Sequence, residues 1–342
     1  MPRLKLIQCG VGGWGAGWAK QRVPESPDFE LAAIVDVSPK ALAEAGDAVG
    51  IPTERRFGSL EAALDRVTAD AVFTVTPPAV HVEHARLAFS RGLHLLTEKP
   101  IADTLENAKL MVKLAAESGR QLAVSQNYRF RPAALTLRRL IAESALGPLG
   151  HGHLDFYIAA DFTGTFRQTM QYPLLVDMAI HHLDLIRSIT GLNIAKVTAV
   201  SFNPTWSWYE HDCGLKMTLE LDGGIPFSYS GDWSARGRFT GWDGDWRLQC
   251  EKGDLAWRDG KLSLGRSGTW CKDLAIEEIA IQPPRFGEYS FVLHNFAEAI
   301  RSGTPAETSG SDNLYSFAAV MAGVRSVKEG RGVRVAELLG SC

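Results

Sequence analysis

Cysteine is scarce in this sequence, and its few copies are scattered. The five residues are Cys9, Cys213, Cys250, Cys271 and Cys342, an odd number without any Cys-x-x-Cys pair. Disulfide frameworks and zinc sites rely on paired or regularly spaced cysteines, so neither is expected. The sequence therefore predicts no metal site and a reducing, cytoplasmic location.

Long hydrophobic runs and a strong charge imbalance are also missing. No apolar stretch approaches the roughly 18 residues that span a bilayer, and the N-terminal MPRLKLIQCGVGG reaches its glycines before a signal-peptide core could form. The formal net charge of −3 favours neither a nucleic acid nor an anionic membrane as partner. We therefore expect no membrane and no nucleic-acid partner. The 342 residues are enough for two domains.

The first third of the chain alternates short apolar runs with helical patterns. Continuous apolar runs are typical of parallel strands that are covered on both faces. Ser59 and Thr104 precede Ala- and Leu-rich segments as N-cap residues. The order predicts a Rossmann-type, doubly wound parallel sheet. The expected strands are 4–10, 29–36, 70–76, 93–99 and 121–127.

After about residue 150 the segments alternate in polarity and are joined by turns that contain Gly and Asp. This pattern predicts antiparallel strands and hairpins, with helices near 174–190 and 312–328. We expect an α/β protein with two domains. Residues 1–125 would form the dinucleotide-binding domain, and 126–342 an α+β domain for substrate binding and oligomerisation, built on an open, mainly antiparallel sheet. The C-terminal segment of the chain would be able to pack back against the first domain.

A glycine-rich segment, CGVGGWGAG, follows the first predicted strand. Gly10, Gly12 and Gly15 fit the Gly-x-Gly-x-x-Gly pattern, in which the glycines allow a tight turn, approach of a pyrophosphate and close packing of the helix. The helix N-terminus would face the phosphates, next to Gly13 and Trp14. A glycine turn without a ligand is the alternative reading.

Asp36 ends the second predicted strand. An acid at this position accepts both ribose hydroxyls of the adenosine and repels a 2′-phosphate, so NAD is favoured over NADP. A solvent-facing acid at a strand end remains the alternative.

The segment VDMAIHHLDLIR is predicted to be helical. On a helix Asp177, His181 and Asp184 share a face, and a carboxylate beside an imidazole suits a proton acceptor near neutral pH. The alternative is an Asp–His pair without a catalytic role, which stabilises the helix by about a few tenths of a kcal/mol.

A strand ending in HLLTEKPIAD places Lys99 at the rim of a sheet, because Pro100 cannot continue the ladder. Together with the Gly-x-Gly-x-x-Gly turn, TPPAVH at 76–81, EKPIA at 98–102, NYRFRP at 127–132 and DMAIHHLD at 177–184 occur in a characteristic order. In these motifs the whole chain resembles the Gfo/Idh/MocA oxidoreductases. Many relatives have a glycine-rich run before the helix, whereas this chain reads MQYPLLVD, which leaves the substrate open.

The resemblance implies roles for individual residues. Lys99 would lie beside the nicotinamide and hydrogen-bond the reacting oxygen, often before a cis proline. His181 would accept the hydroxyl proton while Asp177 orients it. The remaining cofactor residues that the resemblance implies are Thr76, Pro77, His81, Glu98 at the nicotinamide ribose, and Asn127.

Seven of the nine tryptophans fall between positions 206 and 270. Aromatic faces stack on sugars, but on strands they more often cover a sheet or an interface. Trp233, Arg129 and Tyr157 are the candidates for substrate contact. The open sheet predicts a homodimer or homotetramer, as in the family.

The favoured function is an NAD-dependent dehydrogenase of a sugar or polyol. An NAD-dependent glycosidase that uses transient oxidation and a non-catalytic nucleotide sensor remain alternatives. A glycosidase would break a glycosidic bond without net change in cofactor absorbance, and a sensor would bind NAD without turnover.

Overall fold

The computed structural model describes residues 2–266 and 274–340. The chain divides into two compact units, Met1–Asn127 with Phe286–Leu314, and Tyr128–Arg285 with Tyr315–Cys342. The domain boundary expected between residues 125 and 126 stays a prediction. The first unit also includes Phe286–Leu314, from the last fifth of the chain.

The first unit is built on a six-stranded parallel sheet with the strand order β3-β2-β1-β4-β5-β6. This doubly wound order confirms the predicted fold class. The strands are β1 (Leu4–Cys9), β2 (Phe29–Val35), β3 (Arg56–Phe57), β4 (Ala71–Thr74), β5 (His94–Glu98) and β6 (Leu122–Ser125). Their central residues are fully buried, which explains the continuous apolar runs in the sequence.

Helices connect these strands. They are α1 (Gly13–Gly17) with the π-turn η1 (Trp18–Arg22), α2 (Pro39–Val49), α3 (Leu60–Leu64), α4 (His81–Ser90) and α5 (Leu105–Ser118). The hydroxyl of Ser59 accepts from the Ala62 N–H and that of Thr104 from the Asn107 N–H, so both predicted N-caps are confirmed. Short 3₁₀ turns are η2 (Thr53–Arg55) and η3 (Pro78–Val80).

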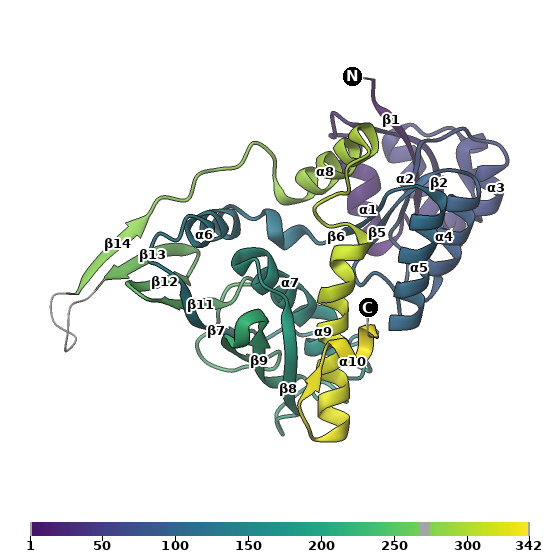
Figure 1. Ribbon diagram of the computed structural model, residues 1–342. Helices are drawn as coiled ribbons and strands as arrows, with labels where there is room; N and C mark the ends of the chain where they lie inside the picture. Colours follow the sequence, from purple (N-terminus) through teal and green to yellow (C-terminus); the bar gives the residue numbers. More distant parts are fainter. Residues whose placement is uncertain (1, 267–273, 341–342) are drawn as a thin grey trace. The chain divides into compact units, whose positions relative to one another are not determined.

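Helix α8 (Glu288–Ser302) belongs to the first unit and lies next to α1 (Figure 1). Phe296 stacks on Phe29 of β2, with ring centroids 5.8 Å apart. Helix α8, and α6 in the second unit, were not predicted from the sequence. Their N-cap residues, Gly287 and Arg131, form no side-chain cap, so the sequence lacks the usual start signal.

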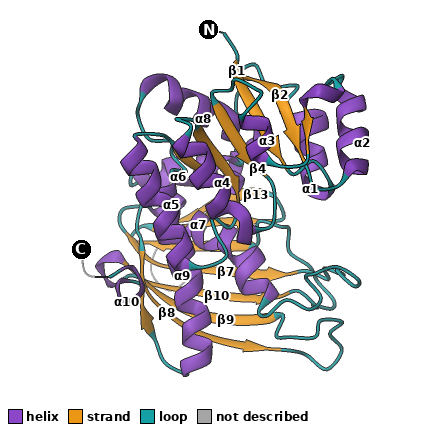
Figure 2. Ribbon diagram, turned by 90° about the vertical axis from the view of Figure 1, so that its right-hand side faces the viewer, coloured by secondary structure: helices purple, strands orange, loops and turns teal. Residues whose placement is uncertain are grey.

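The second unit contains a nine-stranded sheet with the order β14-β13-β12-β11-β7-β10-β9-β8-β15. The pairing is antiparallel except between β10 and β7, as predicted (Figure 2). The strands are β7 (Leu149–Tyr157), β8 (Ile194–Phe202), β9 (Gly214–Leu221), β10 (Pro226–Asp232), β11 (Asp245–Cys250), β12 (Gly253–Arg258), β13 (Lys261–Arg266), β14 (Ala275–Ile279) and β15 (Val333–Arg334).

Helices η5 (Leu174–Met178), α7 (Ala179–Thr190) and α9 (Gly310–Glu329) cover one face of this sheet. The other helical segments are η4 (Asn127–Phe130), α6 (Pro132–Ala142), which packs on α7, η6 (Asp222–Gly224) between β9 and β10, and α10 (Ala336–Leu339) next to β15. Packing of His182 on Phe156 and of Leu174 near Gly231 shows which face α7 and η5 cover. Because side chains alternate along a strand, Tyr157 and Ser230 lie on the opposite face. Trp246 and Trp257 are buried in the sheet and stack on each other, as predicted for most tryptophans.

Three cysteines, Cys9, Cys213 and Cys250, are buried free thiols. Cys271, Cys342 and Trp270 lie outside the described residues. Among the described helices, none has the length and apolar character required to cross a bilayer.

Candidate active site

Backbone packing demands glycine at two positions of the Gly-x-Gly-x-x-Gly turn. Gly10 has φ +84°, and a Cβ there would lie 2.2 Å from the Val75 carbonyl oxygen. A Cβ on Gly15 would lie 2.2 Å from the carbonyl oxygen of Gly10. The turn is therefore pressed between β1, β4 and the start of α1, as in a dinucleotide-binding turn.

Gly12 differs, because nothing in the protein excludes a side chain there. A Cβ on Gly12 would make ordinary contacts, 3.5 Å from Ala41 and 3.7 Å from Asp36. The space that the missing side chain leaves is available to a ligand phosphate, next to Gly13 and Trp14 in the first turn of α1, where helix N–H groups lack intrahelical partners. The turn fits NAD.

Asp36 lies beside this turn. Its Oδ2 accepts hydrogen bonds from the N–H groups of Val11 at 2.9 Å and Gly12 at 3.1 Å, and its Oδ1 accepts from Ser38 at 2.8 Å. The carboxylate is thus held at the end of β2 with a defined orientation. Its predicted contact with a ribose stays a prediction.

The loop after β4 carries Thr76, which is half-buried, and Pro77, which is exposed. The Thr76 hydroxyl is 2.8 Å from that of Thr74. His81, in contrast, is completely buried, and burial lowers the pKa of its imidazole. Its Nε2 lies 3.0 Å from the Thr76 carbonyl oxygen, and its Nδ1 lies 2.8 Å from the Thr97 hydroxyl.

This burial corrects the expectation that His81 lines the cofactor. Nδ1 also lies 3.1 Å from the Ile101 carbonyl oxygen, so both ring nitrogens have partners within the protein. His81 therefore connects the loop after β4 to β5. We assign it the role of positioning Thr76.

Glu98, the last residue of β5, is buried, and tryptophan side chains hold it. Its Oε1 accepts from Trp14 Nε1 at 3.0 Å and from Trp18 Nε1 at 2.8 Å, while Oε2 accepts from the Lys99 N–H at 3.2 Å. Burial raises the pKa of the Glu98 carboxyl, although these hydrogen bonds act in the opposite direction. The peptide bond between Lys99 and Pro100 is cis, as the resemblance implied.

Trp18 is a site residue that the sequence analysis missed. The spacing of four residues between two indoles, Trp14 and Trp18, just after the glycine turn was the available signal. Tyr289 of α8 packs edge-on against both rings, and the Arg22 guanidinium lies 4.0 Å from the Tyr289 ring centroid. The late segment of the chain thus supports the residues that hold Glu98.

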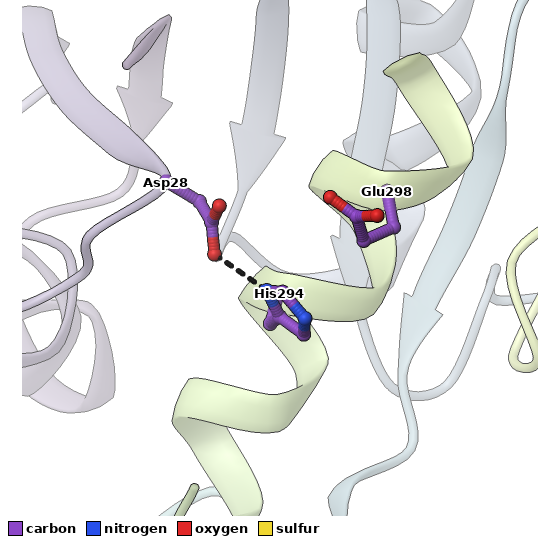
Figure 3. Close-up of side chains that lie close together, drawn as sticks. All are labelled: Asp28, His294 and Glu298. Atoms are coloured by element: carbon purple, nitrogen blue, oxygen red, sulfur yellow. Dashed lines mark hydrogen bonds and ion pairs between the residues drawn. The ribbon is translucent and has the colours of Figure 1, made fainter. Parts of the chain in front are cut away.

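Asp28, His294 and Glu298 form a group of potential metal ligands in the described part of the chain (Figure 3). His294 Nδ1 lies 2.8 Å from Asp28 Oδ2, and Arg301 donates to Asp28 at 2.6 Å and to Glu298 at 3.1 Å. Burial alone would raise the pKa of Asp28, but the bonds from Arg301 and His294 hold it below its ordinary value. The cationic Arg301 already compensates both acids, so the group fastens α8 to the start of β2.

Asn127, the last predicted cofactor residue, ends the first unit. Its side chain is buried, and Nδ2 has no hydrogen-bond partner within 2–266 and 274–340. An unpaired buried amide is costly, so a ligand acceptor here would be stabilising.

In the second unit, the helix with the predicted acid–base pair begins as the π-turn η5. Tyr172, just before it, has φ +51°, a strained value for a residue with a side chain. His181 is 7% exposed and stacks on Tyr128, with ring centroids 4.2 Å apart. Asp177 Oδ2 accepts a 2.6 Å bond from Arg167 Nε, a partner that the sequence analysis did not name.

Two further predictions need correction. Asp184, predicted to share a helix face with Asp177 and His181, is fully buried and accepts from Arg129 Nε and Nη2, both at 2.6 Å. Arg129 is thus committed to a buried ion pair and is no substrate candidate. Trp233 is 1% exposed and stacks on Tyr209, so it belongs to the core.

Tyr157 lies on the sheet face opposite α7. Its hydroxyl is 2.5 Å from Ser230 Oγ and accepts from Lys216 Nζ at 2.9 Å. Sequence alone did not show which face of β7 carries this residue. Tyr157 is therefore removed from the substrate candidates.

Comparisons with known proteins identify the family of both domains. Residues 4–126 match the profile described as an oxidoreductase family with an NAD-binding Rossmann fold, and residues 134–256 match the GFO/IDH/MocA C-terminal domain. An uncharacterized protein y4oX of Sinorhizobium fredii is 28% identical, over 98% of this chain and 97% of its own. A D-apiose dehydrogenase of Paraburkholderia graminis is 27% identical, over 90% of this chain and 84% of its own.

A solved structure shares the fold. It is an oxidoreductase from Agrobacterium radiobacter in complex with NAD+, L-tartaric acid and magnesium, with a TM-score of 0.88 and 22% identity, and the alignment covers 98% of this chain and all of the other. The NAD-binding turn, the order of the motifs and both domain matches lead to one assignment: the chain belongs to the Gfo/Idh/MocA family of NAD-binding oxidoreductases.

Proposed function

We propose that this protein is an NAD(H)-dependent oxidoreductase that transfers a hydride between nicotinamide and a hydroxyl or carbonyl carbon of a sugar, polyol or sugar derivative. The observation that carries the proposal is the hydrogen bond between Trp14 and Glu98. It ties the phosphate-binding turn to the strand end that bears Lys99. The name of the apiose dehydrogenase relative supports a carbohydrate substrate.

NAD, when bound, supplies the hydride acceptor at its nicotinamide ring. Gly12, Gly13 and Trp14 would hold the pyrophosphate, and Asp36 would accept the adenosine ribose hydroxyls. Lys99 would hydrogen-bond the reacting oxygen and stabilise its negative charge as the carbon is oxidised. The proposal requires Lys99 and His181 to act on one substrate.

His181 would accept the hydroxyl proton. The stacking of its ring on Tyr128 restricts its orientation. Asp177 would orient this imidazole and stabilise its protonated form. General-base catalysis of this kind contributes about 100- to 10,000-fold in rate.

The test is formation of NADH by the purified protein with NAD and a panel of polyols, aldoses and glycosides. We expect NADH formation with at least one polyol or aldose. Cleavage of a glycoside without NADH accumulation would replace the dehydrogenase proposal with transient-oxidation chemistry. NAD binding without turnover across the panel would contradict enzymatic activity.

We also propose that a second copy of the chain covers the open sheet face. That face carries an ordered polar network, in which His153 contacts Ser228 and Asp155, each at 2.8 Å, and Tyr157 contacts Lys216. Light scattering after size exclusion should give twice or four times the chain mass, and a monomer would contradict the proposal. A cytoplasmic location stays a prediction.

A further inference from the structure

Arg167 lies between β7 and η5 in a fixed arrangement. Its Nε donates to Asp177 Oδ2 at 2.6 Å, and its guanidinium carbon lies 4.9 Å and 4.6 Å from the ring centroids of Phe162 and Phe166. Its side chain is 29% exposed. The guanidinium is therefore held by an acid and two rings, with part of its surface open to a ligand.

In the part of the chain that the structure describes, no hydrogen bond uses the terminal nitrogens of Arg167. Nη1 and Nη2 of Arg167 have no hydrogen-bond partner in the ranges 2–266 and 274–340. In Arg129, by contrast, both Nε and Nη2 donate to the buried Asp184. A guanidinium offers five donors in a planar fork that matches a carboxylate. Arg167 thus keeps donors available for a planar anion.

The segment around Arg167 is fastened to a neighbouring loop. The carbonyl oxygen of Gln168 accepts from the Glu210 N–H at 3.0 Å, and the Gln171 side chain lies 2.9 Å from His211 Nε2. The Gly164 N–H donates to the Gln168 side chain at 2.7 Å. A preorganised cation loses less entropy on binding than one on a free loop.

We propose that Arg167 is a specificity-determining residue that binds the carboxylate of a sugar acid, such as a uronate or an aldonate. This inference rests on the proposed function. Arg167 contacts Asp177. Asp177 precedes His181 by four residues, so the backbone positions of this acid and of the proposed base are about one helical turn apart. A sugar acid carries its carboxylate and its hydroxyls within one small molecule and can reach both groups.

The test compares matched substrates that differ in the carboxylate. NADH formation is measured with D-galacturonate against D-galactose and with D-gluconate against D-glucitol, for the unmodified protein, Arg167→Gln and Arg167→Lys. Arg247→Gln is the control, because Arg247 also pairs with an aspartate, Asp254 at 2.9 Å, but lies on the open sheet face.

We expect the unmodified protein to prefer the acids. Arg167→Gln should raise KM for the acids about 10- to 100-fold, the effect of losing a charge-assisted hydrogen bond, and change KM for the neutral sugars little. Arg167→Lys should restore part of the acid preference, and Arg247→Gln should leave it unchanged. Thermal unfolding verifies that each variant is folded.

Two results would overturn the inference. If Arg167→Gln lowers kcat/KM equally for acids and neutral sugars, Arg167 acts only through Asp177, and the proposed oxidoreductase function stands. If no substrate is turned over, the proposed function fails, and binding of D-galacturonate to the NAD complex is followed by tryptophan fluorescence. Binding that depends on Arg167 would still support the carboxylate site, and its absence would remove it.

Discussion

Trp14 and Glu98, which are 84 positions apart, are joined by a 3.0 Å hydrogen bond from the indole N–H to a carboxylate oxygen. Trp18 donates to the same oxygen at 2.8 Å. A buried carboxylate costs free energy unless it is hydrogen-bonded, so the two indoles fix the position of Glu98 and offset part of the cost of its charge. The strand end before Lys99 is thereby connected to the glycine turn.

Glu98→Gln should stabilise the ligand-free protein at pH 7. The raised pKa means that the fold disfavours ionised Glu98. The contribution of Glu98 to the free energy of unfolding is fully present below the ordinary carboxyl pKa of 4.5. It is lost as the pH rises through the higher pKa that Glu98 has in the folded protein. Glutamine keeps an acceptor for the indoles and removes the charge. Urea unfolding should show a gain at pH 7 that shrinks toward pH 4.

The control is Glu337→Gln. A hydrogen bond from Arg331 holds the pKa of the exposed Glu337 at about 2, so its removal should give no gain at pH 7. A destabilised Glu98→Gln protein at pH 7 would mean that the indoles require the ionised carboxylate.

Gly12→Ala and Gly15→Ala should have different effects. A Cβ at Gly12 meets only ordinary contacts, so stability should be retained while NAD binding weakens about tenfold or more, since the methyl group enters the phosphate space. A Cβ at Gly15 meets a backbone oxygen at 2.2 Å, which should destabilise the fold by about 1–3 kcal/mol. Calorimetric NAD titration and urea unfolding measure the two effects. Unchanged NAD affinity in Gly12→Ala would place the phosphates elsewhere.

Arg129→Met should destabilise the second unit strongly. The variant leaves the buried Asp184 with Ser316 and the more distant Arg187 beside it. Breaking a buried ion pair costs about 3–5 kcal/mol. Arg167→Met should cost much less, because Arg167 is partly exposed. If both variants unfold at similar urea concentrations, the assignment of a structural role to Arg129 and of a role at the site to Arg167 is wrong.

The buried His182 should make stability fall in acid. Burial lowers the pKa of His182 from 6.5 to about 4, so the fold keeps the ring neutral while the unfolded chain binds a proton. Stability from this residue is present above pH 6.5 and decreases as the pH falls toward 4, by roughly 3 kcal/mol in total. His182→Gln should flatten this part of the pH profile of unfolding. An unchanged slope would assign the acid sensitivity to other groups, such as His84, whose pKa burial also lowers to about 4.

Local patterns predicted much of this fold, because burial and turn geometry leave direct marks on a sequence. The apolar runs of the parallel strands, the N-caps at Ser59 and Thr104, and the required Gly10 and Gly15 are examples. Contacts between distant segments leave no such mark. Arg167 and Tyr289 were missed for this reason, whereas the spacing of Trp18 from Trp14 was a signal that was not used.

Residue type was a poor guide to exposure. Arg129 and Trp233 were predicted to contact the substrate because of their chemistry. In the structure Arg129 is buried in an ion pair with Asp184, and Trp233 is buried and stacks on Tyr209. Tyr157 was misassigned because the two faces of β7 differ only in what packs against them. His81 occupies the expected position of the TPPAVH motif. Its ring, however, is buried and contacts the Thr76 carbonyl oxygen.

The most direct test of the account is turnover by Lys99→Ala compared with the unmodified protein, with NAD binding measured on the same samples. The account predicts that the variant binds NAD and that kcat for the best substrate falls about 100- to 1,000-fold, because the donor to the reacting oxygen is lost. A Lys99→Ala protein that binds NAD and turns over at the unmodified rate would contradict it.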